Sequence, residues 1–220
     1  MPFALFLYNL FLFLFAPVWV PLVVWRNLRR GRPLFGGGFT AGDGEFLRGK
    51  KVVWLHAVSM GESLVGAALY RHLAPILPGT TWVFTTTTPT GYVTWRRMVG
   101  EDGLVRYFPL DLPWTVKKAL RMLRPTLLIL VETELWPNLL YYAHRQGVKT
   151  VVVNGRLSDR TMQRAAKVRA LFAPAVAALD LFLAQSPLDA ERALALGVEK
   201  NKIRVSGNIK FDLDPAETPP

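Results

Sequence analysis

The sequence predicts an α/β fold, with a Rossmann-like parallel sheet that is preceded by an N-terminal membrane helix. The first observation is an alternation of short apolar runs with helical spacings from residue 51 onward. Gly147 and Gly197 each follow a helical pattern and precede the next apolar run, as glycines at helix ends do. The first 25 residues carry no charged side chain. Strands that alternate with helices form right-handed βαβ units, so the sheet should be parallel and covered on both faces.

The N-terminal segment, residues 1–32, is predicted to be a membrane anchor helix with a basic flank. Its uncharged run is long enough, at ~1.5 Å per residue, to cross a ~30 Å hydrocarbon core. Because basic residues prefer the cytoplasmic side, the rest of the chain should lie in the cytoplasm. Pro17 and Pro21 interrupt the run, so a monotopic helix in the membrane plane stays open beside a single-pass helix. The basic flank consists of Arg26, Arg29, Arg30 and Arg32.

The chain after this segment divides into a linker and a lobe. Residues 33–50 are glycine-rich and are predicted to be a linker. Residues 51–212 are predicted to form one Rossmann-like lobe, which is an ordinary domain size. Its expected strands are Val52–Val58, Trp82–Thr87, Val105–Phe108, Leu127–Val131, Thr150–Val153, Leu181–Ala184 and Ile203–Val205. Its expected helices are Glu62–Leu77, Thr90–Met98, Trp114–Leu123, Trp136–Gln146, Asp159–Ala178 and Leu188–Leu196.

The composition limits the classes of function. The 220 residues contain no cysteine, which excludes disulfide scaffolds, thiolate metal sites and cysteine nucleophiles. The three histidines are scattered along the chain, so a histidine-built metal site is not expected either. With 27 basic and 16 acidic residues the net charge is +11, which favours an anionic partner: nucleic acid, acidic lipid or a phosphorylated small molecule. No Gly-x-Gly-x-x-Gly turn follows the first strand, which argues against a Rossmann-type nucleotide binder.

Ligands of such sheets bind beyond the carboxyl ends of the strands, so function is sought just after each strand. After the first strand, Ser59 and Glu62 stand three residues apart and flank Gly61. This spacing fits a capping box, in which the hydroxyl and the carboxylate satisfy backbone amides. It also fits a general base at a helix start, provided that a partner or desolvation offsets the acidifying effect of the helix N-terminus. Both interpretations stay open at this point.

Two further strand ends carry polar side chains. Thr87 and Thr88 belong to the run TTTTPTG after the second strand, where hydroxyls and amides could hold sugar or phosphate oxygens. The alternative is that threonine favours strands and that the Pro-Thr-Gly sequence only turns the chain. Glu132, Glu134 and Asn138 follow the wholly apolar run LLILV, so at least one carboxylate should emerge at the rim of the sheet. The later strand ends supply Arg156, Asn208 and Lys210.

The motifs HAVSMGE, TTTTPTG, VETELWPN, NGRLS and GNIKFD, in this order, resemble the N-terminal half of the Kdo transferases of lipopolysaccharide synthesis. The resemblance implies the N-terminal lobe of a GT-B glycosyltransferase that moves 3-deoxy-D-manno-oct-2-ulosonic acid (Kdo) from CMP-Kdo to lipid IVA. It implies inversion at the sugar and no metal cofactor. Carried over, Glu62 is the general base, and Glu132 and Lys210 stabilise the transition state. The substrate-binding residues expected on the same basis are Ser59, Gly61, Thr87, Thr88, Glu134, Asn138, Arg156 and Asn208, and the share of Glu134 in the chemistry is undecided.

The resemblance covers the acceptor side of the family better than the donor side. Residues 213–220 are expected to be a truncated interlobe segment, since the family's second lobe begins about here and carries most of the CMP-binding residues. The 220 residues alone are therefore expected to bind the lipid IVA acceptor and the inner membrane, with the lobe on the cytoplasmic side, but not to transfer Kdo. The alternative is a non-catalytic, membrane-anchored lobe that binds acidic glycolipid or a partner protein. Neither hypothesis involves nucleic acid.

Overall fold

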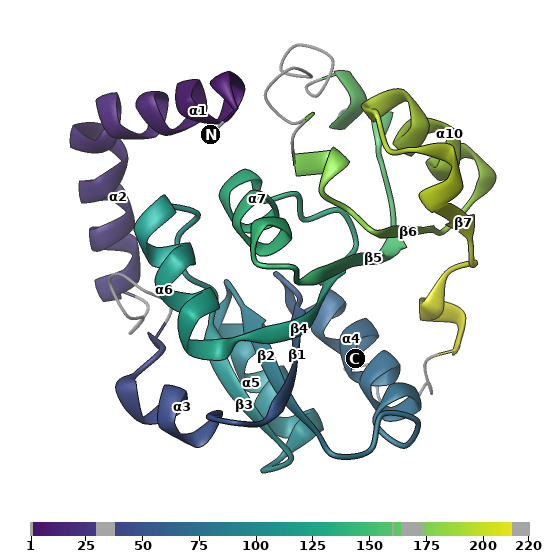
Figure 1. Ribbon diagram of the computed structural model, residues 1–220, viewed down its shortest axis with the longest axis horizontal. Coiled ribbons are helices and arrows are strands. Elements are labelled where there is room, and N and C mark those ends of the chain that lie inside the picture. The colour runs from purple at the N-terminus through teal and green to yellow at the C-terminus, as the bar shows by residue number, and fades with distance from the viewer. Residues whose placement is uncertain (1, 30–37, 160, 164–172, 174, 213–220) are drawn as a thin grey trace.

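The computed structural model describes residues 2–29, 38–159, 161–163, 173 and 175–212 (Figure 1). The expected helix over Asp159–Ala178, the arginines of the basic flank beyond Arg29 and the segment 213–220 lie largely or wholly outside the described residues. The strands are β1 (Lys51–His56), β2 (Thr80–Thr86), β3 (Gly103–Tyr107), β4 (Pro125–Val131), β5 (Lys149–Gly155), β6 (Leu181–Ala184) and β7 (Ile203–Val205). The helices are α1 (Phe3–Leu14), α2 (Ala16–Arg29), α3 (Ala41–Phe46), α4 (Met60–Leu73), α5 (Pro89–Val99), α6 (Pro113–Leu123), α7 (Pro137–Arg145) and α10 (Pro187–Leu196), with 3₁₀ turns η2 (Lys200–Lys202) and η3 (Ile209–Asp212).

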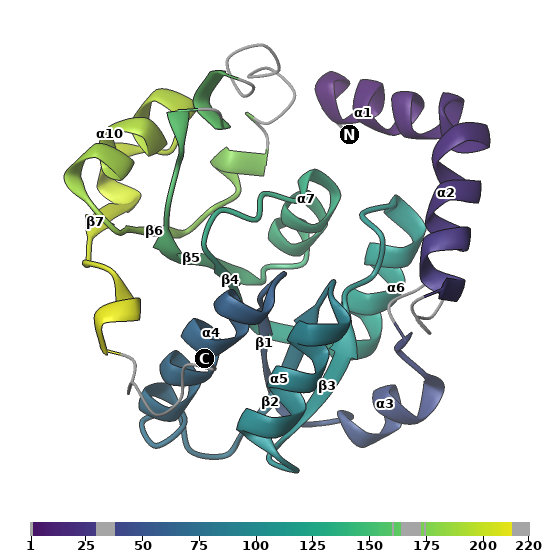
Figure 2. The same cartoon turned by 180° about the vertical axis from the view of Figure 1, so that it is seen from behind.

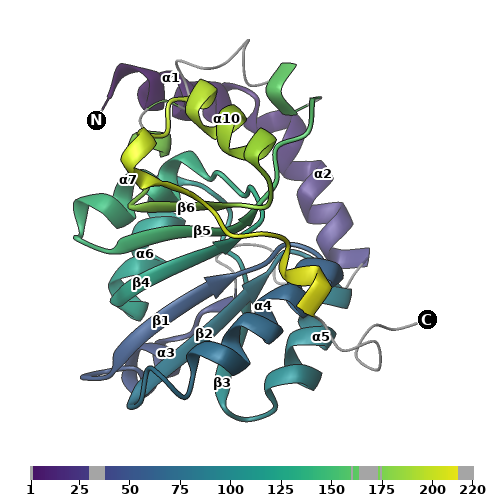
Figure 3. The same ribbon diagram turned by 90° about the vertical axis from the view of Figure 1, so that its right-hand side faces the viewer.

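All seven strands pair in parallel in one sheet, in the order β3-β2-β1-β4-β5-β6-β7, which confirms the predicted α/β fold. The chain builds β1, β2 and β3 outward in one direction and then returns to place β4 on the other side of β1 (Figure 3). The strand order therefore reverses between β1 and β4. In doubly wound sheets this switch point opens a crevice at the carboxyl edge, where ligands bind.

The core is divided between the two faces of the sheet, as the alternation of side chains along a strand requires. Val52 and Trp54 of β1 belong to one buried cluster, which also contains apolar side chains of α6 and α7. Val53 and Leu55 belong to the other cluster, which packs beneath α4 and α5. Helices thus cover both faces, and side chains of the central strands are almost fully buried. A ligand site is therefore sought at the carboxyl ends of the strands.

The N-terminal segment is not the single helix that we expected. Two helices, α1 and α2, meet at a bend of 67° and form an L along one side of the molecule (Figure 2). Neither is long and apolar enough to span a membrane by itself, although the two taken together pass such a test of length and composition. The break precedes Pro17, which cannot donate a hydrogen bond and whose ring would clash with the carbonyl four residues earlier. The indole Nε1 of Trp19 donates to the carbonyl of Leu12 across the bend, at 2.7 Å.

The predicted linker, residues 33–50, contains a helix that its glycines concealed. Thr40 and Asp43 form a capping box at the start of α3. The carboxylate of Asp43 also accepts two hydrogen bonds from Arg106 of β3, at 2.5 and 3.0 Å. Phe39 and Leu47, on either side of α3, are 6% and 3% exposed in the core. Residues 38–50 are therefore packed onto the lobe.

Candidate active site

The switch point brings the predicted carboxylates to one edge of the sheet. Glu62 lies in the first turn of α4, which follows β1, and Glu132 directly follows β4. Because β1 and β4 are parallel neighbours, their carboxyl ends open into the same crevice. The turn η3, which carries Lys210, packs against α4 (Figure 1). We call Glu62, Glu132, Glu134 and Lys210 the carboxylate cluster.

Glu62 is held by its own loop. Its Oε2 accepts from the backbone amide of Val58 at 2.8 Å, and its Oε1 accepts from the hydroxyl of Ser59 at 2.7 Å. The hydroxyl of Ser59 in turn accepts from the backbone amide of Glu62, so Ser59 is the N-cap of α4. Burial raises the pKa of the Glu62 carboxyl above its ordinary value, and the charge of Glu132 adds to this, while the two hydrogen bonds oppose it. Desolvation thus supplies the basicity that a helix N-terminus would otherwise remove.

The threonines after β2 support the same loop. The hydroxyls of Thr86, Thr87 and Thr88 all donate to the carbonyl of Val58, at 2.8, 3.4 and 3.2 Å. Thr88 also caps α5, since its hydroxyl accepts from the amide of Gly91 at 3.0 Å. Thr87 and Thr88 thus have a structural role in this loop, and their contact with substrate stays a prediction. Gly61 faces open space, since an added Cβ would meet nothing within 4 Å.

The other members of the carboxylate cluster face one another. The Nζ of Lys210 donates to Oε1 of Glu132 at 3.0 Å, which joins the end of β4 to a segment 78 positions later. Glu132 has a backbone φ of 60°, a left-handed conformation that is uncommon for a residue other than glycine. The pKa of Glu134 is raised to about 7, mainly by burial and further by the charges of Glu62 and Glu132. Burial and the neighbouring carboxylates thus favour the protonated form of Glu134.

Asn154 is a site residue that the sequence interpretation missed. It is the penultimate residue of β5, with φ 54°, is fully buried, and its Oδ1 accepts from the backbone amide of Ile209 at 3.0 Å. The amide of Lys210 donates to Oδ1 of Asn208, also at 3.0 Å. These two bonds fix the segment that carries the lysine. The available signal was the asparagine of NGRLS itself, because asparagine tolerates left-handed backbone better than other non-glycine residues.

The structure gives Asn138 a different role from the predicted one. Asn138 is fully buried, and its Nδ2 donates to Oδ1 of Asn9 in α1 and to the carbonyl of Asp111, at 2.9 and 2.6 Å. Asn9 returns a bond from its Nδ2 to Oδ1 of Asn138 at 3.0 Å. Both the oxygen and the nitrogen of this amide therefore have partners within the chain. Asn138 instead docks α1 onto α7, and we call Tyr8, Asn9, Asp111 and Asn138 the docking cluster.

Asp111 is the centre of the docking cluster. Its carboxylate accepts from the amides of Asn138 and Leu139, at 3.0 and 2.9 Å, and from the hydroxyl of Tyr8 at 3.2 Å. Burial raises its pKa to about 6, and the hydrogen bonds from these donors oppose that rise. Asp111 thus ties the N-terminal helix to the element that follows Glu132 and Glu134.

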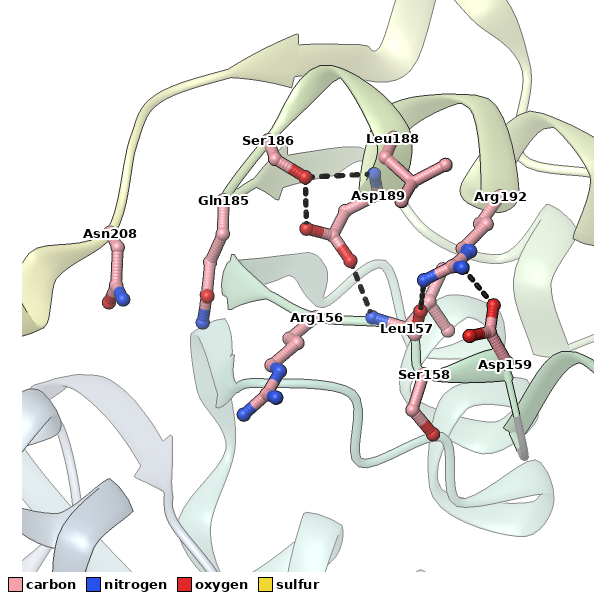
Figure 4. A pocket seen from close by; sticks show the side chains of 10 residues that line it. All are labelled: Arg156, Leu157, Ser158, Asp159, Gln185, Ser186, Leu188, Asp189, Arg192 and Asn208. Atoms are coloured by element: carbon pink, nitrogen blue, oxygen red, sulfur yellow. Dashed lines mark hydrogen bonds and ion pairs between the residues drawn. The ribbon is translucent and has the colours of Figure 1, made fainter.

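The last predicted residues, Arg156 and Asn208, line one pocket beyond the ends of β5, β6 and β7 (Figure 4). Thr133, between Glu132 and Glu134, connects this region with the carboxylate cluster, since its hydroxyl donates to the carbonyl of Arg156 at 2.5 Å. Among the residues that the structure describes, no group of three His, Asp or Glu side chains is placed to hold a metal ion. The arrangement offers a carboxylate of raised pKa, a lysine–glutamate pair and a polar pocket, which suit proton removal from a hydroxyl and stabilisation of developing charge.

Comparison with known sequences finds a family match and several relatives that bear the same description. Residues 35–213 match the family described as 3-deoxy-D-manno-octulosonic-acid transferase (kdotransferase). A 3-deoxy-D-manno-octulosonic acid transferase of Haemophilus influenzae is 35% identical over 162 residues, which are 74% of this chain and 38% of that protein. Another, from Chlamydophila psittaci, is 31% identical over 93% of this chain and 48% of its own length. The chain thus spans less than half the length of these relatives.

Comparison with solved structures finds the same fold in sugar-nucleotide enzymes. The UDP-GlcNAc 2-epimerase of Neisseria meningitidis, bound to UDP-GlcNAc, aligns with a TM-score of 0.54 at 12% identity. The alignment covers 74% of this chain and 48% of the epimerase. At this identity the likeness concerns the fold alone.

Proposed function

The chain belongs to the 3-deoxy-D-manno-octulosonic-acid transferase family, and from this premise we propose that it is the acceptor-binding lobe of an inverting glycosyltransferase. The reaction is transfer of Kdo from CMP-Kdo to lipid IVA in lipid A-core biosynthesis, without a metal cofactor. The relatives extend well beyond the part that this chain matches, and we assign donor binding mainly to that further part. The observation that carries the proposal is a carboxylate of raised pKa, Glu62, at the switch point of the sheet.

In the proposed mechanism, Glu62 is the general base. A hydroxyl of the acceptor sugar gives its proton to the Glu62 carboxylate while its oxygen attacks the anomeric carbon of Kdo. The bond to CMP breaks and its electron pair leaves with the CMP phosphate. The bonds from Val58 and Ser59 orient the carboxylate, and burial raises its pKa and thus its affinity for a proton.

Glu132 and Lys210 stabilise the transition state as a pair. The carboxylate of Glu132 can stabilise positive charge at the anomeric carbon, as carboxylates do in glycoside chemistry. The ammonium of Lys210 can stabilise negative charge on the departing phosphate or on the Kdo carboxylate. The two are 3.0 Å apart, so each fixes the position of the other before substrate arrives. Glu134, with a pKa of about 7, can donate a hydrogen bond to substrate in its protonated form.

The N-terminal helices attach the lobe to the cytoplasmic face of the inner membrane, in the plane rather than across it. The docking cluster supports this arrangement, since Tyr8 and Asn9 hold α1 against the lobe through polar contacts. The opposite side of α1 is apolar and exposed, with Phe3 at 74% and Leu14 at 63% exposure. An apolar surface beside a net charge of +11 suits the interface of an anionic membrane.

The test is Glu62→Gln in a version of the chain that carries a donor lobe, assayed for Kdo transfer to lipid IVA in membranes. We expect transfer to fall about 10²–10⁴-fold, the range that general-base catalysis contributes, with lipid binding retained. Glu101→Gln, at an exposed position in the turn before β3, is the matched control and should transfer normally. Normal transfer by Glu62→Gln would reject the assignment. A wild-type version that binds acidic glycolipid but never transfers would favour the non-catalytic, membrane-anchored lobe.

A further inference from the structure

A pocket of about 440 Å³ lies at the carboxyl ends of β5, β6 and β7, beside the carboxylate cluster (Figure 4). Its walls come from the segment after β5, the first turn of α10 and the segment after β7. The volume is in the range of pockets that hold small molecules, and it exceeds what a single small ion fills. The mechanism proposed above does not use this pocket.

The acidic side chains in the wall are bonded to groups of the chain itself. Asp189, in the first turn of α10, accepts from the amide of Leu157 at 2.8 Å and from the hydroxyl of Ser186, the N-cap of this helix, at 2.5 Å. Asp159 forms an ion pair with Arg192, which also donates to the carbonyl of Leu157. Hydrogen bonds and an ion pair within the chain thus hold both acidic side chains in the wall.

Three polar side chains are left to face the open part of the pocket. Figure 4 shows Arg156, Gln185 and Asn208 extending toward the same side, away from the Asp189 network. Among the residues that the structure describes, the guanidinium of Arg156 has no hydrogen-bond or ion-pair partner. Gln185 and Asn208 are each fixed by one bond, to the carbonyl of Asn154 and to the amide of Lys210 respectively, both at 3.0 Å. Each amide side chain therefore keeps one end available to a ligand.

The same bonds connect the pocket with the carboxylate cluster. Asn208 and Asn154 fix the two residues, Ile209 and Lys210, at the start of η3, and Lys210 reaches Glu132. A ligand in the pocket would therefore lie against the segment that positions the lysine. A substrate that reacts at Glu62 can place a second part of itself here.

We propose that this pocket binds an oxyanion group, phosphate or carboxylate, of a transfer substrate, with Arg156 as its cationic ligand. The proposal rests on the proposed function for the presence of sugar substrates at this edge. A guanidinium presents two parallel N–H groups that match the oxygens of a phosphate or carboxylate, and the amides of Gln185 and Asn208 supply further polar contacts. The group can come from two sources: a phosphate of the acceptor glycolipid, or the phosphate or carboxylate of the donor.

The experiment is a binding titration of the full chain in detergent micelles, which needs no transfer. Three probes are used: a bisphosphorylated glucosamine disaccharide without acyl chains, its phosphate-free counterpart, and CMP. The variants are Arg156→Gln, Arg156→Lys and, as the matched control, Arg97→Gln at an exposed position of α5. Since Arg156 is exposed and its side chain is unpaired, removing its charge should leave the fold intact.

For an acceptor phosphate, Arg156→Gln should weaken binding of the phosphorylated disaccharide at least about tenfold and leave the phosphate-free disaccharide unchanged. Arg156→Lys should lie between, and Arg97→Gln should match the wild type. A loss confined to CMP would assign the oxyanion to the donor. Three results would overturn the proposal. In the first, Arg156→Gln binds every probe as the wild type does. In the second, it loses as much affinity for the phosphate-free as for the phosphorylated disaccharide, and in the third the wild type binds none of the probes. If Glu62→Gln transfers Kdo normally while Arg156→Gln shows these losses of binding, the assignment of the general base is rejected and the assignment of the pocket is retained.

Discussion

The carboxylate cluster and the docking cluster differ in the groups that surround their carboxylates. In the docking cluster, the carboxylate of Asp111 accepts from three donors, and the amides of Asn9 and Asn138 pair with each other in both directions. In the carboxylate cluster, Glu62 and Glu134 are both raised in pKa by burial and by neighbouring like charge. The donors around Asp111 hold α1 and α7 together, whereas Glu62 and Glu134 lie among like charges, which favour binding of a proton.

The largest expected effect on stability comes from breaking the docking cluster. Asp111→Ala removes the acceptor for two buried amides and for the hydroxyl of Tyr8, and each orphaned donor costs about 1–3 kcal/mol. We expect the free energy of unfolding, measured with denaturant, to fall by roughly 3 kcal/mol or more. Asp102→Ala, at an exposed turn, should change it by less than about 0.5 kcal/mol. Equal stabilities of the two variants would remove the contrast between the clusters.

The carboxylate cluster should show the reverse pattern, with activity lost and stability kept. Lys210→Met breaks a partly exposed ion pair, which contributes only about 0.2–1 kcal/mol to folding. We expect transfer by a two-lobed version to fall roughly 10²–10³-fold, as for other groups that stabilise developing charge. Lys118→Met, an exposed substitution on α6, is the control and should keep its transfer rate. A Lys210→Met variant that is strongly destabilised but transfers normally when folded would assign Lys210 to the scaffold.

Ser59 has a structural role as the N-cap of α4 and also donates a hydrogen bond to Glu62, so its substitution should affect both stability and the chemistry. Ser59→Ala removes the N-cap of α4, which should lower the free energy of unfolding by about 1 kcal/mol. It also removes a hydrogen bond that favours the charged form of Glu62, so the pKa of Glu62 should rise further. The pH dependence of single-turnover transfer reports that rise. A stability loss without any shift of the pH profile would make Ser59 a cap and nothing more.

A further expected effect is a pH dependence of stability carried by Glu134. Its pKa is raised in the fold from 4.5 to about 7, so the folded state binds the proton more tightly than the unfolded state does. This contribution is present in full below about pH 4.5 and is lost as the pH rises through 7. Glu134→Gln lacks it, so the stability of the variant relative to wild type should increase with pH across that window. A difference that stays constant from pH 4 to pH 8 would contradict the raised pKa.

The sequence predicted the sheet well because its strands are short, apolar and separated by helix signals. The expected strands Leu181–Ala184 and Ile203–Val205 agree with β6 and β7 residue for residue. The carboxylates at the edge followed from their place just after β1 and β4, since parallel strands end at one edge. What could not be predicted depends on distant partners. Asp43 gains its role from Arg106, 63 residues away, and this pairing turned an expected linker into a packed helix.

The docking cluster could not be predicted from the sequence either, because its residues are also far apart along the chain. Asn138 stands in a motif after β4 and was expected to bind substrate, but its partner is Asn9, 129 residues earlier. A spacing pattern cannot indicate that pairing, because it arises only when α1 folds back onto α7. The bend between α1 and α2 was likewise hidden, although Pro17 marked its position.

The most direct test of the account is the single-turnover rate of Kdo transfer as a function of pH, for wild type and Glu62→Gln in a two-lobed version. We expect the wild-type rate to fall as the pH drops through the raised pKa of Glu62, because the protonated carboxyl cannot accept the proton of the attacking hydroxyl. The Glu62→Gln rate should be low and should lack that acidic limb. A Glu62→Gln enzyme with the wild-type rate and the same acidic limb would contradict the claim that this carboxylate is the base.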